Sequence, residues 1–269
     1  MSVPRVSPIL TLTTDFGLQD HYVATMKGVI LSRCPEARLV DISHDIPPFS
    51  ILQAAYTIDQ AAKYFPVGAV HLIVVDPGVG TPRRPVCAQA LGQSFVAPDN
   101  GCLTLVAKRD PCICVRELTN RDFWLPSPSS TFHGRDIFSP VAAALAGGSA
   151  RFEDLGPTLQ DLELLSGLDP RQVEAGLWIA TIISVDRFGN AITNLKASEF
   201  QQLSAVPFEL EAGRQTVTRF AKTFGDAPPD VCFVFAGSSG YLELGMNRQS
   251  AAERLKLAPG DAVTLRLRH

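Results

Sequence analysis

The sequence predicts an α/β protein, with an N-terminal domain built on a mainly parallel sheet flanked by helices and a smaller C-terminal antiparallel β-barrel domain. Three observations predict this class. Strand and helix patterns alternate in the first part of the chain, short strands crowd together in the last part, and a stretch of weak periodicity separates them. We therefore divide the chain into a first domain over residues 1–155, a linker over 156–175 and a second domain over 176–269.

The first domain opens with three runs that predict strands: 9–14, which is apolar and rich in β-branched residues, 37–42, and the apolar run 70–75. A helical spacing of apolar residues follows each of the first two runs. Asp20 is expected to cap the first helix and Ser50 the second, which continues to Ala62. This βαβαβ order indicates a parallel sheet with helices on both faces.

The pattern changes after Asp76. Four apolar runs follow, the first two of which flank a Leu-Gly-Gln turn and predict a hairpin: 86–90, 95–97, 103–107 and 113–118. A long loop over 119–132 then leads to His133, and loops of this length are often functional. Asp136 is expected to start a helix that ends at the Gly147-Gly148 pair.

The second domain is predicted to consist of strands. Its two longest apolar runs, 177–185 and 191–195, flank a turn over 186–190 and predict a hairpin. Further strands are predicted at 208–211, 216–220, 231–235, 241–244 and 262–267. Short strands at such close spacing are typical of a small antiparallel barrel.

Composition and charge favour a soluble protein with a small-molecule ligand. The 269 residues are 46% hydrophobic and 19% charged, which supplies a sizeable core. A net charge of -3 provides no basic stripe, so we expect neither nucleic acid nor an anionic membrane as a partner. We see no signal-peptide pattern and no run of membrane-spanning length. The six cysteines lack zinc or redox spacing and are expected to be reduced thiols in a cytoplasmic protein.

Polar residues at the carboxyl ends of the predicted parallel strands are the first candidates for a site. Asp15 follows the first strand and Asp76 the third, and both stand beside glycine-bearing turns that let backbone approach a ligand closely. A carboxylate in such a place can accept both hydroxyls of a ribose diol. The alternative is that each aspartate merely caps a turn or a helix.

Two basic groups and one titratable ring could act with these carboxylates. Arg83 and Arg84 follow Asp76 closely, and one of them can pair with its carboxylate, although both can equally be solvated. His133 at the end of the long loop suits proton transfer near neutral pH. The histidines show no metal-ligand spacing, and the glycines after Asp76 fit no phosphate-binding loop, which disfavours NAD and ATP.

Two turns of the second domain also carry candidate groups. Asp186, Phe188 and Asn190 share one hairpin turn and offer a carboxylate, an aromatic face and an amide that can read a base edge. The small-residue loop over 236–241 can present backbone N–H groups and hydroxyls to a carboxylate. Ordinary turn chemistry explains both segments equally well.

The order of these segments is far more specific than any one of them. The segments are Thr14-Asp15-Phe16-Gly17, Asp41-Ile42-Ser43-His44-Asp45, Val75-Asp76-Pro77-Gly78-Val79-Gly80, Phe132-His133-Gly134-Arg135-Asp136, Phe188-Gly189-Asn190 and Ser238-Ser239-Gly240-Tyr241-Leu242-Glu243. This series, from about residue 9 to residue 267, resembles the SAM hydroxide adenosyltransferases, whose framework the fluorinases and chlorinases share.

The resemblance implies an enzyme that hydrolyses S-adenosyl-L-methionine (SAM) to adenosine and L-methionine by attack of an activated water or hydroxide at C5′, with no cofactor and no metal. It implies a homotrimer that holds SAM between the N-terminal domain of one subunit and the C-terminal domain of the next. An Asp, Arg, His catalytic set falls on Asp76, Arg83 and His133, and the family spacing selects Arg83 over Arg84. The halide-using branch carries other residues in place of Asp76 and His133, so we rank halogenation below hydrolysis.

The same resemblance implies substrate-binding residues in both domains. Asp15 would hold the ribose diol and Phe49 would wall the reacting carbon. Adenine would be contacted by Phe188, Asn190, Phe224 and main chain near Met246, and the amino-acid end by Asp186, Ser238 and Glu243. The turn at Asp186 is one residue shorter than in the halogenases, and Ile192 stands where they carry an aromatic residue.

Three alternatives stay open from the sequence. A SAM- or adenosine-binding protein without turnover would keep Asp15 and Asn190 but would not need the Asp76, Arg83 and His133 set. A SAM-dependent halogenase would act only with added halide. A metal-dependent phosphatase would use Asp15 and other acidic residues such as Asp20, but no further acidic cluster at ligand spacing supports a cation site.

Overall fold

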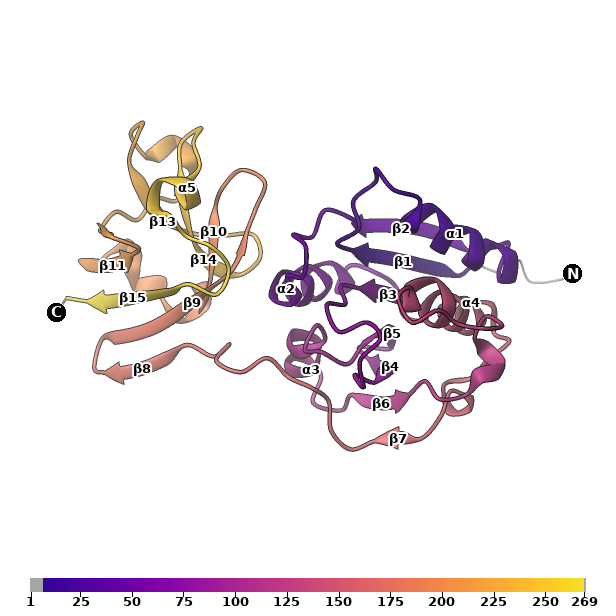
Figure 1. The fold of residues 1–269 in the computed structure, drawn as a ribbon. Helices are drawn as coiled ribbons and strands as arrows, with labels where there is room; N and C mark the ends of the chain where they lie inside the picture. Colours follow the sequence, from indigo (N-terminus) through magenta and orange to yellow (C-terminus); the bar gives the residue numbers. More distant parts are fainter. Residues whose placement is uncertain (1–6, 269) are drawn as a thin grey trace, which may run out of the picture. The chain divides into compact units, whose positions relative to one another are not determined.

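The computed structural model describes residues 7–268 (Figure 1). The chain divides into two units, Met1–Leu165 and Ser166–His269, and each has a hydrophobic core of its own. The first unit is α/β and the second is built mainly of antiparallel strands, which confirms the predicted fold class. Residues 158–159 pair with the sheet of the first unit and residues 171–174 with that of the second, so the segment expected as a linker contributes a strand to each.

The first unit is built on a seven-stranded sheet in the order β2-β1-β3-β5-β4-β6-β7. The strands are β1 (Ile9–Thr14), β2 (Arg38–Ser43), β3 (Val70–Val74), β4 (Pro85–Ala90), β5 (Gln93–Pro98), β6 (Cys114–Glu117) and β7 (Thr158–Leu159). The neighbours β2, β1 and β3 are parallel, as predicted, and β5 also runs parallel to β3. The antiparallel pairs of β5 with β4, β4 with β6 and β6 with β7 make the whole sheet mixed rather than mainly parallel.

Helices cover both faces of this sheet. Successive residues of a strand point to opposite sides, and in β3 both sides carry apolar residues. Leu72 and Val74 belong to the core beneath α1 (Tyr22–Arg33) and α4 (Ser139–Gly147). Ile73 and Val75 belong to the core beneath α2 (Ile51–Ala62) and α3 (Thr104–Arg109) on the other face (Figure 1). The central strand β3 is thus buried on both sides, which explains why its residues other than His71 are apolar.

Several helix starts differ from the sequence-based expectation. Helix α1 begins after His21 without a side-chain cap, so Asp20 does not cap it, and α2 begins after Ser50 as predicted but without a hydrogen bond from the serine hydroxyl. Asp136 lies inside a π-helical turn, η2 (Gly134–Phe138), and α4 begins only at Ser139. The Asp136 carboxylate accepts a hydrogen bond from the Ser129 backbone N–H instead of capping a helix.

The second unit contains an eight-stranded antiparallel sheet in the order β12-β11-β15-β9-β10-β14-β13, with β8 paired to β9. The strands are β8 (Arg171–Glu174), β9 (Leu177–Val185), β10 (Ala191–Lys196), β11 (Phe208–Ala212), β12 (Gln215–Val217), β13 (Cys232–Ala236), β14 (Tyr241–Met246) and β15 (Ala262–Leu267). An isolated bridge from Phe220 to Val234 near the sheet ends gives it a barrel-like, nearly closed form. Helix α5 (Ala251–Leu255) packs its apolar face into the core.

Short 3₁₀ turns complete the two units. They are η1 (Arg121–Phe123), η3 (Phe152–Asp154), η4 (Ala197–Glu199), η5 (Gln201–Ser204) and η6 (Phe224–Asp226). The turn η1 lies within the long loop before His133 and is capped by the side chain of Asn120, which accepts a hydrogen bond from the Asp122 N–H. This loop is therefore built from local turns rather than extended chain.

A buried polar chain crosses the parallel half of the sheet at His71 on β3. Its Nε2 lies 3.2 Å from Gln93 Oε1, and its Nδ1 lies 2.7 Å from Thr11 Oγ1. Because the Gln93 amide nitrogen donates to the Ala62 carbonyl, its oxygen is the acceptor, and the imidazole carries its proton on Nε2. The ring also stacks on Phe95. Burial lowers the pKa of His71 from its usual 6.5 to about 4, so the fold holds the ring neutral.

The neutral state of His71 predicts a pH-dependent stability. Between pH 6.5 and about 4 the unfolded chain protonates His71 while the folded protein does not, so stability falls as the pH is lowered through this window. We expect this group to add about 1.4 kcal/mol per pH unit to the slope of the unfolding free energy. When the unfolding free energy is measured by urea at several pH values in this range, it should depend less steeply on pH for His71→Gln than for the wild type. Equal slopes would contradict a neutral buried His71.

Candidate functional site

The first group of candidate residues lies at the carboxyl ends of the neighbouring parallel strands β1 and β3. Asp15 directly follows β1, and its Oδ2 accepts a hydrogen bond of 2.9 Å from the Phe49 backbone N–H. Phe49 adopts a φ of 68° and leaves 70% of its surface exposed. Burial raises the pKa of Asp15, and the negative charge of Asp76 contributes in the same direction. The two carboxylates therefore interact electrostatically at this edge of the sheet.

Asp76 is bound by Arg83 through the Nε–Nη2 edge of the guanidinium group. Arg83 Nε lies 2.9 Å from Oδ1 and 3.1 Å from Oδ2, and Nη2 also donates to Oδ2. The side chains of Arg83 and Asp76 are only 9% and 5% exposed. Arg84 instead pairs with Asp99 and Asp161. The structure thus distinguishes two arginines that residue-level reasoning had left equivalent.

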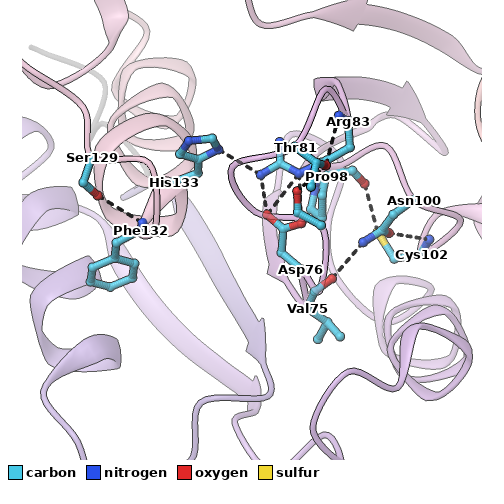
Figure 2. A network of polar contacts seen from close by, with 11 residues as sticks. Val75, Asp76, Thr81, Arg83, Pro98, Asn100, Cys102, Ser129, Phe132 and His133 are labelled. Atoms are coloured by element: carbon cyan, nitrogen blue, oxygen red, sulfur yellow. Dashed lines mark hydrogen bonds and ion pairs between the residues drawn. The ribbon is translucent and has the colours of Figure 1, made fainter.

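His133 completes this group through Arg83 (Figure 2). Arg83 Nη2 lies 3.0 Å from His133 Nδ1, and the guanidinium group also covers the ring of Phe138 at 5.0 Å. A guanidinium group has only donors, so Nδ1 must accept this hydrogen bond with its lone pair. Burial and the positive charge of Arg83 lower the pKa of His133. The ring is therefore neutral near pH 7 and carries its proton on Nε2.

The loop before His133 is fastened by a buried carboxylate. Asp136 accepts a hydrogen bond of 2.8 Å from the Ser129 backbone N–H and pairs with the Arg135 side chain. The same loop presses on the turn after Asp76, because a Cβ placed on Gly80 would lie 2.6 Å from the Ser130 carbonyl oxygen. Gly80 also has a φ of 78°, which favours glycine. The two loops that carry Asp76 and His133 are therefore packed directly against one another.

His44 belongs to one of the sequence motifs but was not among the predicted site residues. The ring is buried between β1 and β2, with Nδ1 2.8 Å from Thr14 Oγ1 and Nε2 3.0 Å from Asp41 Oδ1. Its backbone oxygen accepts a hydrogen bond from the Gly17 N–H. His44 thereby braces both ends of the short segment that contains Asp15.

A second group of candidates lies in the second unit around a cavity of about 580 Å³. Four of the predicted residues line it together with the segment after β14: Phe188, Asn190, Phe224 and Met246. Phe188 leaves 80% of its surface exposed on the rim, whereas Asn190 and Met246 are buried. The cavity therefore combines aromatic faces with a buried amide.

The polar residues predicted to bind the amino-acid end of SAM lie on the turn between β9 and β10 and on the segment that joins β13 to β14 and begins β14. Asp186 uses its carboxylate to hold its own turn, with hydrogen bonds from the Phe188 N–H and from the Asn190 backbone and side chain. Glu243 accepts a hydrogen bond from Ser239, and burial raises its pKa, with a smaller contribution from the charge of Asp186. Ser238 lies exposed in the same loop.

The described part of the chain lacks the features of a metal site and of a membrane-spanning helix. Within residues 7–268, no three His, Cys, Asp or Glu side chains gather in a way that could hold a metal ion. Across that same range, none of the helices is long and apolar enough to cross a membrane.

Comparison with known proteins identifies the family. Residues 10–156 match the SAM hydroxide adenosyltransferase N-terminal domain, and residues 180–264 match the corresponding C-terminal domain. The chain belongs to the SAM hydroxide adenosyltransferase family. This family membership confirms the resemblance that the order of the motifs indicated.

Relatives within this family match nearly the whole chain. A curated (R)-S-adenosyl-L-methionine hydrolase of Salinispora tropica is 40% identical and covers 96% of this chain and 97% of its own length. A hydrolase of the same name from Thermus thermophilus is also 40% identical, and the match covers 94% of this chain and 97% of the relative. A fluorinase of Nocardia brasiliensis is 28% identical and covers 97% of each chain. The crystal structure of a conserved protein from Thermotoga maritima, 38% identical, superimposes with a TM-score of 0.86 and covers 96% and 99%.

The buried Asp76–Arg83 pair predicts an asymmetry in stability. We expect Arg83→Leu to lower the free energy of unfolding by about 3 kcal/mol, because it leaves a buried carboxylate without its cation. The double variant Asp76→Asn, Arg83→Leu should regain most of this loss. Arg151→Leu is the matched control, since Arg151 pairs with Asp154 at the surface. Urea unfolding in which Arg83→Leu loses no more stability than Arg151→Leu would contradict the prediction.

Proposed function

We propose that this protein hydrolyses S-adenosyl-L-methionine to adenosine and L-methionine. The observation that carries the proposal is that one buried guanidinium group, Arg83, binds both Asp76 and His133. Hydrolases 40% identical over nearly the whole chain support the same substrate and reaction. Neither a cofactor nor a metal takes part in the proposed reaction.

The chemistry requires an oriented water more than a strong acid. The sulfonium makes C5′ electrophilic, and methionine leaves as a neutral thioether, so the leaving group needs no proton. The oxygen of water forms a bond to C5′ while the C5′–S bond breaks and its electron pair stays on sulfur. Placing the water in line with that bond is the main contribution of the site.

The protonation states of Asp76, Arg83 and His133 give each residue a different role in the reaction. Arg83 has no acceptor, and His133 presents Nε2–H as a donor because its Nδ1 is bound to Arg83. His133 therefore donates a hydrogen bond to the oxygen of the water, and the Asp76 carboxylate accepts the proton that the water loses. A weak base suffices, since the proton leaves an oxonium centre once the new C–O bond has formed.

The remaining candidates bind the substrate in this proposal. The Asp15 carboxylate receives the ribose diol, and Phe49 shields the reacting carbon. Adenine occupies the cavity lined by Phe188, Asn190, Phe224 and Met246, whose aromatic faces and buried amide suit a purine. The ammonium and carboxylate of the methionine end meet the loop groups Asp186, Ser238 and Glu243.

We further propose a cytoplasmic homotrimer in which the N-terminal domain of one subunit and the C-terminal domain of the next supply one site. Both sets of candidate residues are needed to bind a whole SAM molecule, and the resemblance described above implies that neighbouring subunits supply them. Specific activity should then fall when the protein is diluted below its assembly constant. Sedimentation at the same concentrations gives the subunit count, and constant activity down to monomer would refute a shared site.

The reaction can be tested with the purified protein and SAM in halide-free buffer that contains a chelator and oxygen-18 water. We expect adenosine labelled at its 5′-oxygen together with methionine, followed by mass spectrometry. Asp76→Asn should reduce turnover on the order of a hundredfold or more. Asp154→Asn, which alters another Asp–Arg pair away from this group, should leave turnover unchanged.

Other outcomes of this assay favour other functions. Intact SAM in the presence of bound ligand would indicate a binding protein without turnover. A product that forms only when chloride or fluoride is added would indicate a halogenase, an activity related to that of the fluorinase relative.

A further inference from the structure

Asn100 makes two hydrogen bonds next to the Asp76–Arg83 pair (Figure 2). Its Nδ2 donates to the Val75 carbonyl at 2.9 Å, and its Oδ1 accepts from the Cys102 backbone N–H at 3.2 Å. Val75 is fully buried and directly precedes Asp76. The pairing of β3 with β5 ends at Leu72 and Val96, so the amide side chain serves Val75 beyond the end of the strand ladder.

The loop that carries Asn100 is itself held in place. The neighbouring Asp99 accepts hydrogen bonds from Arg84 Nε at 2.7 Å and from the Glu163 backbone N–H at 2.8 Å. Its own backbone N–H donates to the Arg84 carbonyl at 2.9 Å. Gly101, with a φ of 99°, packs so closely on Leu165 that a Cβ would lie 2.8 Å from Leu165 Cγ. The amide of Asn100 is thus offered to Val75 from a fixed support.

Asp76 is consequently fixed at two points. Arg83 binds its carboxylate, and Asn100 binds the carbonyl of the peptide group that links Val75 to Asp76. Rotation of that peptide group would turn the Cα–Cβ bond of Asp76 and move the carboxylate away from Arg83. Neither Asn100 nor Asp99 was identified from the sequence as part of the site.

We infer that Asn100 is a positioning residue, which fixes the direction of the Asp76 side chain by holding the Val75 carbonyl. The inference rests on the proposed hydrolysis of SAM for its kinetic consequence. Asn100 acts through Asp76, so its loss should affect the chemical step rather than substrate binding.

The first experiment compares Asn100→Ala with Asn120→Ala. Asn120 is a matched control in the same unit, since its Nδ2 donates to the Asp154 carbonyl at 2.9 Å and its Oδ1 accepts from the Asp122 N–H at 3.1 Å. Asn100→Ala should lower kcat for SAM hydrolysis about tenfold to a hundredfold, with KM almost unchanged. Asn120→Ala, which loses equivalent hydrogen bonds, should keep both constants.

Asn100→Asp separates the two hydrogen bonds of the side chain. The aspartate keeps the acceptor for Cys102 but has no N–H for Val75, so we expect kcat to fall as far as in Asn100→Ala. Retention of wild-type kcat by Asn100→Asp would mean that Asn100 only closes its own turn, and the inference would be wrong. Because the substitution is isosteric, it also serves if Asn100→Ala fails to fold.

Crystal structures of the variants test the inference without reference to activity. In Asn100→Asp the Asp76 carboxylate should leave its two-oxygen contact with Arg83 Nε, whereas in Asn120→Ala it should keep that contact. An unmoved Asp76 in Asn100→Asp would overturn the inference. An inactive wild-type protein would overturn the proposed function instead, and the two crystal structures would still decide the role of Asn100.

Discussion

Arg83 is a buried cation that donates hydrogen bonds to a carboxylate and to an imidazole, and the geometry of the candidate site in the first unit depends on these contacts. A guanidinium group can only donate hydrogen bonds, so it requires acceptors wherever it is not solvated. Asp76 supplies two acceptor oxygens and His133 supplies a ring nitrogen. Arg83 thus decides which atom of His133 carries the proton and is one of the groups that hold the Asp76 carboxylate in place. Displacing Asp76 would leave the buried cation unpaired, which is costly.

The sheet explains how these groups meet. Strands β1, β3 and β5 are parallel neighbours, so their carboxyl ends reach the same edge. Asp15 follows the first of them, Asp76 the second and Asn100 the third. His133 arrives by a different route, through a long loop that is tied down by Asp136 and packed on Gly80. The strands set the position of the carboxylates, and the loop adds the imidazole.

The central elements of the fold could be predicted because their sequence signals are strong. The run over Val70–Val74 is apolar except for His71 and is buried on both faces, which leaves little choice of structure. The apolar run over 103–107 was less informative, since a short run without clear periodicity fits a helix as well as a strand, and it forms α3. Asp136 was expected to start a helix. Its carboxylate binds the backbone of a loop, and this tertiary contact outweighs its local preference.

The candidate site could be predicted only in part, because residue types are local and their pairing is not. Asp15 and Asp76 stand at strand ends that the periodicity identifies, but Arg83 and Arg84 are adjacent, and Asp99 decides between them by taking Arg84. Asn100 gives an even weaker signal, since Asn-Gly after a strand predicts no more than a turn. Its reach to Val75 depends on the pairing of β3 with β5, a contact between segments 25 residues apart in sequence. The groups that hold a reactive side chain in place are therefore harder to find in a sequence than the reactive side chain itself.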